Sequence, residues 1–167
     1  MKKLIFIPLM LFAVNAALFA QASATATATA VIVGPIGISN TANMNFGNVA
    51  VGASPGTVVL TPAGGRTPTG GVTLPATTGT VAAAAFTVTG AAGYTYAITL
   101  PSAALTISSG ANSMTVDNWT SNPTPTGTLD GGGSQALTVG ATLHVSGSQA
   151  AGNYTSATPF TVTVNYN

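Results

Sequence analysis

The chain has 167 residues, of which 46% are apolar and 3% are charged, and it contains no cysteine. This length and apolar content suffice for one folded domain with its own core, and no disulfide can support that fold. Three Lys or Arg residues are too few to neutralise several phosphates, so nucleic acid is excluded as a partner.

The N-terminus has the pattern of a secretory signal peptide. Two lysines precede an apolar run from Leu4 to Phe19, and small residues follow it. We place cleavage after Ala22, with Ala20 and Ala24 as alternatives, so that residues 1–22 form the cleaved peptide. The run is shorter than the roughly 18 to 20 uninterrupted apolar residues that a bilayer span needs, and we expect no transmembrane segment after cleavage. One arginine then remains against two aspartates, a net charge of −1, and so neutral a surface favours self-association.

The segment SATATATAVIV, Ser23 to Val33, alternates alanine with threonine before it becomes aliphatic. We expect residues 23–29 to form an N-terminal extension or an edge strand, and residues 30–167 to form a single domain. A strand is expected to begin within residues 30–33 and to pair either in its own domain or with a neighbouring molecule. Extended, the segment spans roughly 33 to 36 Å, enough to cross a sandwich. Its candidate interface residues are Val31, Ile32 and Val33.

The rest of the chain consists of short alternating runs rich in Val, Ile, Thr and Tyr, punctuated by Gly, Pro, Asn and Ser. We expect strands at Ala30–Ile38, Met44–Val51, Thr57–Thr61, Ala84–Thr89, Tyr94–Leu100, Ser113–Trp119, Gln135–Val145 and Phe160–Tyr166. No segment after the signal peptide repeats apolar residues with a helical period. The pattern predicts an all-β fold, an immunoglobulin-like antiparallel β-sandwich with Greek-key connections.

The last run, PFTVTVNYN, has one apolar face and one polar face. A strand that ends the chain leaves its edge uncovered, and an uncovered edge accepts another strand. The apolar face is therefore a second candidate for strand exchange. Its residues are Phe160, Val162, Val164 and Tyr166.

Reactive side chains are too few to indicate an enzyme. His144 is the only histidine, and Asp117 and Asp130 are the only carboxylates. Neither a nucleophile elbow nor a phosphate-binding glycine loop occurs, so we expect no catalytic residue, cofactor or metal. We expect Asp117 to face solvent or cap a turn, and Asp130 with the three glycines after it to form a hairpin turn.

One cation and several aromatic residues remain to be placed. Arg66, in a turn of glycines and prolines, is expected to pair with an aspartate or to donate to loop carbonyls. Trp119 with Tyr94, Tyr96 and Tyr154 would offer a sugar-stacking face, although a lone tryptophan in a β-protein more often lies in the core. Tyr154 is also placed to hydrogen-bond to upstream backbone, as a tyrosine corner does, or to leave its hydroxyl in water.

The chain contains, in order, the segments MNFGNVAVGASPGTVVLTPAGGRTPTGGVTL, AAFTVTGAAGYTYAITLP, SMTVDNWTSNPTPTGTLDGGGSQALTVGATLHV and AAGNYTSATPFTVTVNYN. Through them it resembles, from about Ala24 to Asn167, a family of exported bacterial β-proteins catalogued as domain of unknown function 4402. More distantly, it is similar to spore-coat-U-type chaperone-usher pilins, which often carry a disulfide that this chain cannot form. The resemblance implies an exported immunoglobulin-like sandwich of Gram-negative bacteria without established enzymatic activity.

From these observations we expect an exported, non-enzymatic structural or surface protein, a pilus-like subunit that assembles by strand addition. Its partners would be copies of itself, a periplasmic chaperone and an outer-membrane assembly factor. Its location would be the periplasm, the cell surface or the extracellular space. The alternative is a monomeric periplasmic or surface module that binds glycans through exposed aromatic residues.

Overall fold

A computed structural model describes residues 21–167, so the expected signal peptide lies outside the described residues except for its last two positions. The chain divides into two units, of which the first ends at Ile32 and the second runs from Val33 to Asn167. In the first unit, residues 21–32 are all exposed and form no strand.

The strand expected over Ala30–Ile38 is wrong for most of its length, because the first strand, β1 (Gly37–Ala42), begins only at Gly37. Gly34 and Pro35 come directly before it. Proline has no N–H to donate to a ladder, and glycine stabilises an extended backbone poorly, so this pair separates the aliphatic residues from β1.

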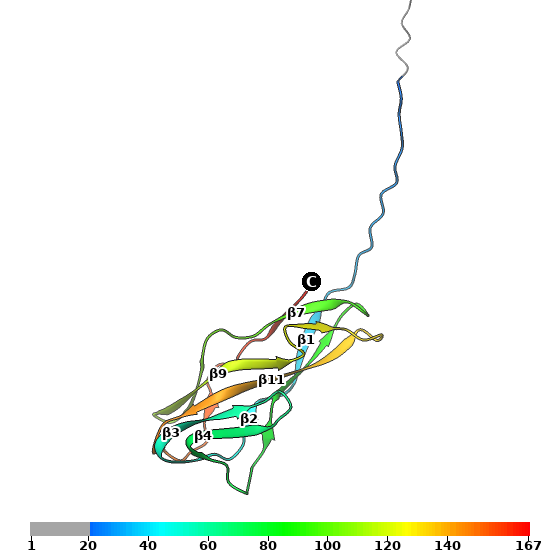
Figure 1. The fold of residues 1–167 in the computed structure, drawn as a ribbon. Helices are drawn as coiled ribbons and strands as arrows, with labels where there is room; N and C mark the ends of the chain where they lie inside the picture. The colour runs from blue at the N-terminus through cyan, green and yellow to red at the C-terminus, as the bar shows by residue number, and fades with distance from the viewer. Residues whose placement is uncertain (1–20) are drawn as a thin grey trace, which may run out of the picture. The chain divides into compact units, whose positions relative to one another are not determined.

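The second unit is an antiparallel β-sandwich (Figure 1). Its larger sheet has the order β1-β6-β11-β9-β8-β12, with β3 paired to β11 and β4 paired to β3. The other strands of this sheet are β3 (Ala50–Leu60), β4 (Arg66–Thr73), β6 (Ala84–Thr89), β8 (Leu105–Ser109), β9 (Asn112–Asn122), β11 (Ser134–Val145) and β12 (Thr155–Ser156). The all-β sandwich predicted from the sequence is confirmed.

The smaller sheet has the order β10-β7-β13, formed by β10 (Thr126–Thr128), β7 (Thr95–Thr99) and β13 (Thr163–Tyr166). Two short strands, β2 (Asn45–Phe46) and β5 (Val81–Ala82), pair only with each other. Every strand pair of the described residues is antiparallel. The expected turn forms at residues 130–133, where the N–H of Gly133 donates to the carbonyl of Asp130 at 3.0 Å and Gly133 has a φ of 74°. It is not the turn of a paired hairpin, because β10 and β11 lie in different sheets.

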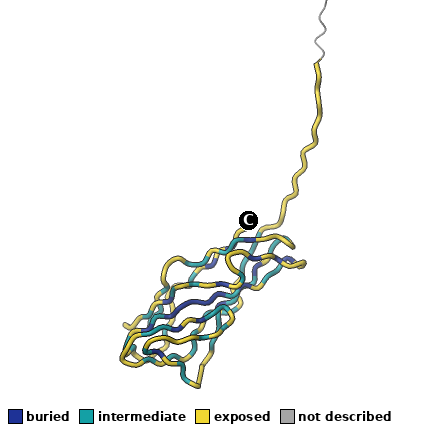
Figure 2. The backbone as a smooth tube through the Cα atoms, in the orientation of Figure 1, coloured by how far each residue is buried: buried dark blue, intermediate teal, exposed yellow. Residues whose placement is uncertain are grey.

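The central strand of the larger sheet changes its neighbour halfway along. The first half of β11 pairs with β6 as far as Val139, and the second half pairs with β3 from Ala141 onward. Gly140 lies at the change, where a Cβ would collide with the carbonyl oxygen of Leu60. Residues 139–143 of β11 are all buried, and Figure 2 shows this run in the middle of the sheet.

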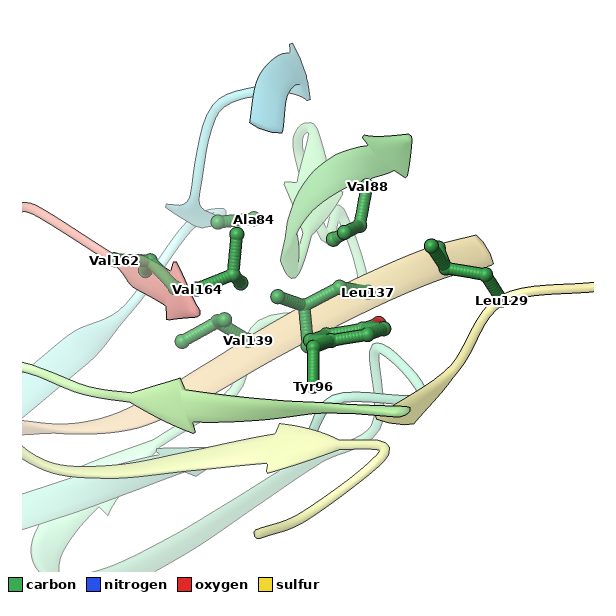
Figure 3. Packing of buried hydrophobic residues seen from close by; sticks show 8 residues of the cluster. All are labelled: Ala84, Val88, Tyr96, Leu129, Leu137, Val139, Val162 and Val164. Atoms are coloured by element: carbon green, nitrogen blue, oxygen red, sulfur yellow. The ribbon is translucent and has the colours of Figure 1, made fainter. Parts of the chain in front are cut away.

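The core consists of two clusters that differ in what covers them. Figure 3 shows the inter-sheet cluster, in which side chains converge from both sheets: Ala84, Val88, Tyr96, Leu129, Leu137, Val139, Val162 and Val164. The second cluster draws all its buried members from the larger sheet, and we call it the one-sheet cluster: Val58, Val72, Val116, Ala141, Leu143 and Val145. No strand of the smaller sheet contributes to it.

Candidate functional site

An uncharged groove opens over part of the one-sheet cluster. It has a volume of about 1360 Å³, and none of the residues that line it is charged. One wall is the larger sheet, whose inward side chains there include Leu105 and Ile107 of β8. The opposite side is formed by residues 43–51 and by residues 149–156, 159 and 160. The groove is therefore larger than the roughly 300 to 1,000 Å³ of an ordinary small-molecule pocket.

The strap, residues 149–160, is held loosely. Nine of its twelve residues are exposed, and only Gln149, Tyr154 and Phe160 are partly buried. The Gln149 amide donates to the carbonyl of Ser113 at 3.3 Å and to the Tyr154 hydroxyl at 2.9 Å. Two backbone positions pair β12 with β8. So few anchors make the strap one of the regions that opens at low free energy.

Tyr154 forms hydrogen bonds within the strap. Its hydroxyl donates to the carbonyl of Ala150 at 2.7 Å, so of the two placements expected from the sequence it adopts the bond to upstream backbone. Tyr154 directly precedes the two-residue strand β12.

The N-terminal segment, residues 23–33, exposes large apolar side chains. Val31 is 89% exposed and Ile32 is 96% exposed, whereas Val33, the first residue of the second unit, is 36% exposed. A soluble surface rarely places two such residues in succession without a partner, because each forgoes about 1.5 to 3 kcal/mol of burial free energy.

The apolar face of the last strand points into the chain's own core. Val162 and Val164 are each 7% exposed, and Phe160 and Tyr166 pack against the inter-sheet cluster. The alternation predicted from the sequence is therefore confirmed, but these side chains are not available to a partner. Within the described part of the chain β13 pairs only with β7, so its outer backbone edge is free.

The end of the last strand is tied to the start of the second unit. The Tyr166 hydroxyl donates to the carbonyl of Gly34 at 3.2 Å and accepts a hydrogen bond from the backbone N–H of Ala91 at 2.6 Å. These bonds fix the ends of the sandwich to each other.

His144 and Asp117 form a pair on the outer face of the larger sheet. Nε2 of His144 lies 2.7 Å from Oδ1 of Asp117, and the side chains are 42% and 36% exposed. Asp117 lies within β9 and so caps no turn; of its two expected placements, the solvent-facing one holds. An exposed pair of this kind contributes only about 0 to 1 kcal/mol. Residues 21–167 contain no group of three His, Cys, Asp or Glu residues that could hold a metal ion.

Arg66 donates to loop carbonyls, which is one of the two roles expected of it. Its Nη1 donates to the carbonyl of Phe46 at 2.6 Å and to that of Asn48 at 2.9 Å. Gly47 between them has a φ of 67°, in the left-handed region that favours glycine. Arg66 therefore fixes the loop that forms one rim of the groove.

The aromatic residues proposed for a sugar-binding face differ in burial and in packing partner. Tyr96 is fully buried, its hydroxyl donates to Oε1 of Gln135 at 2.8 Å, and burial raises its pKa. Trp119 packs on Phe160 at a ring distance of 4.5 Å, and Tyr94 packs on Tyr166 at 5.7 Å. Tyr96 therefore belongs to the core and not to an exposed face.

Sequence reasoning missed the groove, the strap and the Asp117–His144 pair. The pair had a sequence signal, since two polar side chains stand within otherwise alternating strands. The groove had no sequence signal. It is open because the smaller sheet does not extend over the one-sheet cluster.

Comparison with known proteins gives one match. A family model described as a domain of unknown function, DUF4402, matches residues 36–166. No curated protein and no solved structure matches the chain. Among the residues that the structure describes, no helix is long and apolar enough to cross a membrane.

Proposed function

We propose that this chain, which belongs to the DUF4402 family, is an exported, non-enzymatic structural protein of the cell surface that assembles with copies of itself by strand addition. The observation that carries the proposal is the exposure of Val31 and Ile32 on a segment that forms no strand. A surface with so few charges adds little repulsion between copies.

The alternating sequence of the N-terminal segment supports its role as the added strand. Alanine side chains contribute only about 0.8 kcal/mol each, so residues 23–29 hold a partner weakly. Among the aliphatic residues that follow, Ile32 has the largest side chain and supplies most of the attraction. Export would proceed through the signal peptide of residues 1–22, and a periplasmic chaperone with an outer-membrane assembly factor of a Gram-negative bacterium would keep the segment from pairing early.

Electrophoresis of the purified chain from Ser23 tests the proposal. Ladders that survive detergent at room temperature and collapse on boiling are expected, because main-chain hydrogen bonds hold an added strand along its length. Deletion of residues 23–32 should remove the ladders and leave the sandwich folded. A single monomer peak in size-exclusion chromatography at high protein concentration would contradict the proposal.

Glycan binding, the alternative function, has less support. Tyr94 is 45% exposed, but Tyr96 is in the core and Trp119 is partly covered by Phe160. Binding of the monomer to immobilised polysaccharide, lost in Tyr94→Ala, would favour this alternative.

A further inference from the structure

We infer that the groove is the acceptor site for the N-terminal segment of a second copy, and that this segment pairs with β8 in place of β12. The inference rests on the proposed assembly and adds to it the place and the orientation of the added strand.

The edge of β8 provides the backbone partners that a buried strand needs. Every N–H and C=O that leaves water must find a hydrogen bond, so the added strand has to lie against a free edge rather than on a side-chain surface. β8 has five residues, but β12 covers only Ile107 and Ser108, and no strand among residues 21–167 pairs with the outer edge at Leu105 and Thr106. The edge is therefore mostly unpaired, and its present partner is two residues long.

The strap is weaker than the segment that would replace it. β12 contributes Thr155 and Ser156, both exposed, whereas the N-terminal segment contributes Ile32 after a run of alternating alanines. An exchange lengthens the ladder on β8 and adds apolar surface beside Leu105 and Ile107. Neither the groove nor the N-terminal segment has a charged side chain, so no charged side chain loses water in the exchange.

The alternation of the segment determines its orientation. Threonines occupy positions 25, 27 and 29 and share a face with Val31 and Val33, whereas alanines occupy positions 24, 26, 28 and 30 and share a face with Ile32. In a sheet with one solvated side, the polar face turns outward and the apolar face turns inward. The segment therefore enters with Ile32 in the groove and Val31 on the solvent side, next to the outward-facing Thr106.

Disulfide trapping between two copies tests the site, because the chain has no cysteine of its own. One copy carries Thr29→Cys or Val31→Cys, and the other carries Thr106→Cys on β8. Cysteines directly opposite each other on neighbouring strands have Cβ atoms about 4.5 to 5.5 Å apart, so an approach of up to about 1 Å brings them to the roughly 3.5 to 4.5 Å of a disulfide. Mixing two singly substituted chains excludes a bond within one copy.

Thr163→Cys on β13 is the matched control, because it is also an exposed threonine on an edge strand. We expect covalent dimers with Thr106→Cys and few with Thr163→Cys. Equal trapping at both positions, or trapping at Thr163 alone, would overturn the β8 site and leave strand addition in place. Ladders that form without trapping at Thr106 would also overturn the β8 site and leave strand addition in place. If no variant forms ladders or dimers, the proposed function fails together with the inference.

Discussion

Replacing Ile32 with alanine should weaken assembly without weakening the fold. Ile32 is 96% exposed in the single chain, so its side chain contributes almost nothing to the stability of the monomer. In the groove of a second copy the same side chain would be buried. The substitution removes three carbons at about 0.8 kcal/mol each, or about 2.4 kcal/mol, which raises the dissociation constant about 50-fold. The free energy of unfolding should change by no more than about 0.5 kcal/mol.

Val31→Ala is the matched control. Val31 is the neighbouring residue and is 89% exposed, but it lies on the threonine face of the segment. Sedimentation velocity over a range of protein concentrations gives the dissociation constant of each variant, and calorimetry gives its Tm. We expect a large effect from Ile32→Ala and a small one from Val31→Ala. The reverse order would refute the orientation, and unchanged assembly in both variants would refute burial of this segment altogether.

Three further predictions concern the sandwich itself. Because burial raises the pKa of Tyr96 above the ordinary value of 10.0, its contribution to stability is fully present below that pH and is lost as the pH rises above it. Thermal unfolding at alkaline pH should therefore show a smaller decline in Tm for Tyr96→Phe than for the exposed control Tyr94→Phe. Arg66→Met removes two charge-assisted hydrogen bonds and should lower the free energy of unfolding in urea by about 2 to 3 kcal/mol. Gly140→Ala forces a Cβ into the backbone of β3 and should cost about 3 kcal/mol in the same assay, whereas Gly131→Ala, which meets no atom within 4 Å, should change little.

The strands that the sequence predicts best are those with a strict period of two and a buried face. Ala84–Thr89 coincides with β6, and Gln135–Val145 is one residue shorter than β11. Tyr94–Leu100 exceeds β7 by one residue at each end. In each case the apolar residues of the alternation enter the core, as the hydrophobic pattern predicts, although in β11 the residues between them are also buried over 139–143.

β4 was missed because its composition is that of a turn. The stretch RTPTGGVT contains a proline and two glycines, which normally argue against a strand. β4 is an edge strand that pairs only with β3, and an edge tolerates Pro68 because the missing N–H need not meet a partner. Pairing with β3 then determines the conformation of β4, and the sequence of residues 66–73 alone does not predict that pairing.

Of the two parts of the candidate site, the sequence predicts the exposed N-terminal segment but not the groove. Exposure of Val31 and Ile32 follows from the glycine and proline that separate them from β1, and both features are in the sequence. The groove depends on which half of β11 the smaller sheet covers. That choice is made by long-range pairing of β7, β10 and β13, and no local pattern specifies it.

The range of the family match separates the two halves of the proposed interface. Residues 36–166 contain β8, the strap and every residue that lines the groove, so the acceptor is built into the part of the chain that the family shares. Ile32 and the alternating alanines lie before that range. Strand donation is therefore a property argued for this chain, whereas the weakly covered edge of β8 is a feature to seek in other members. A member that lacks an aliphatic N-terminal segment but keeps the groove should accept the segment of this chain without forming ladders alone.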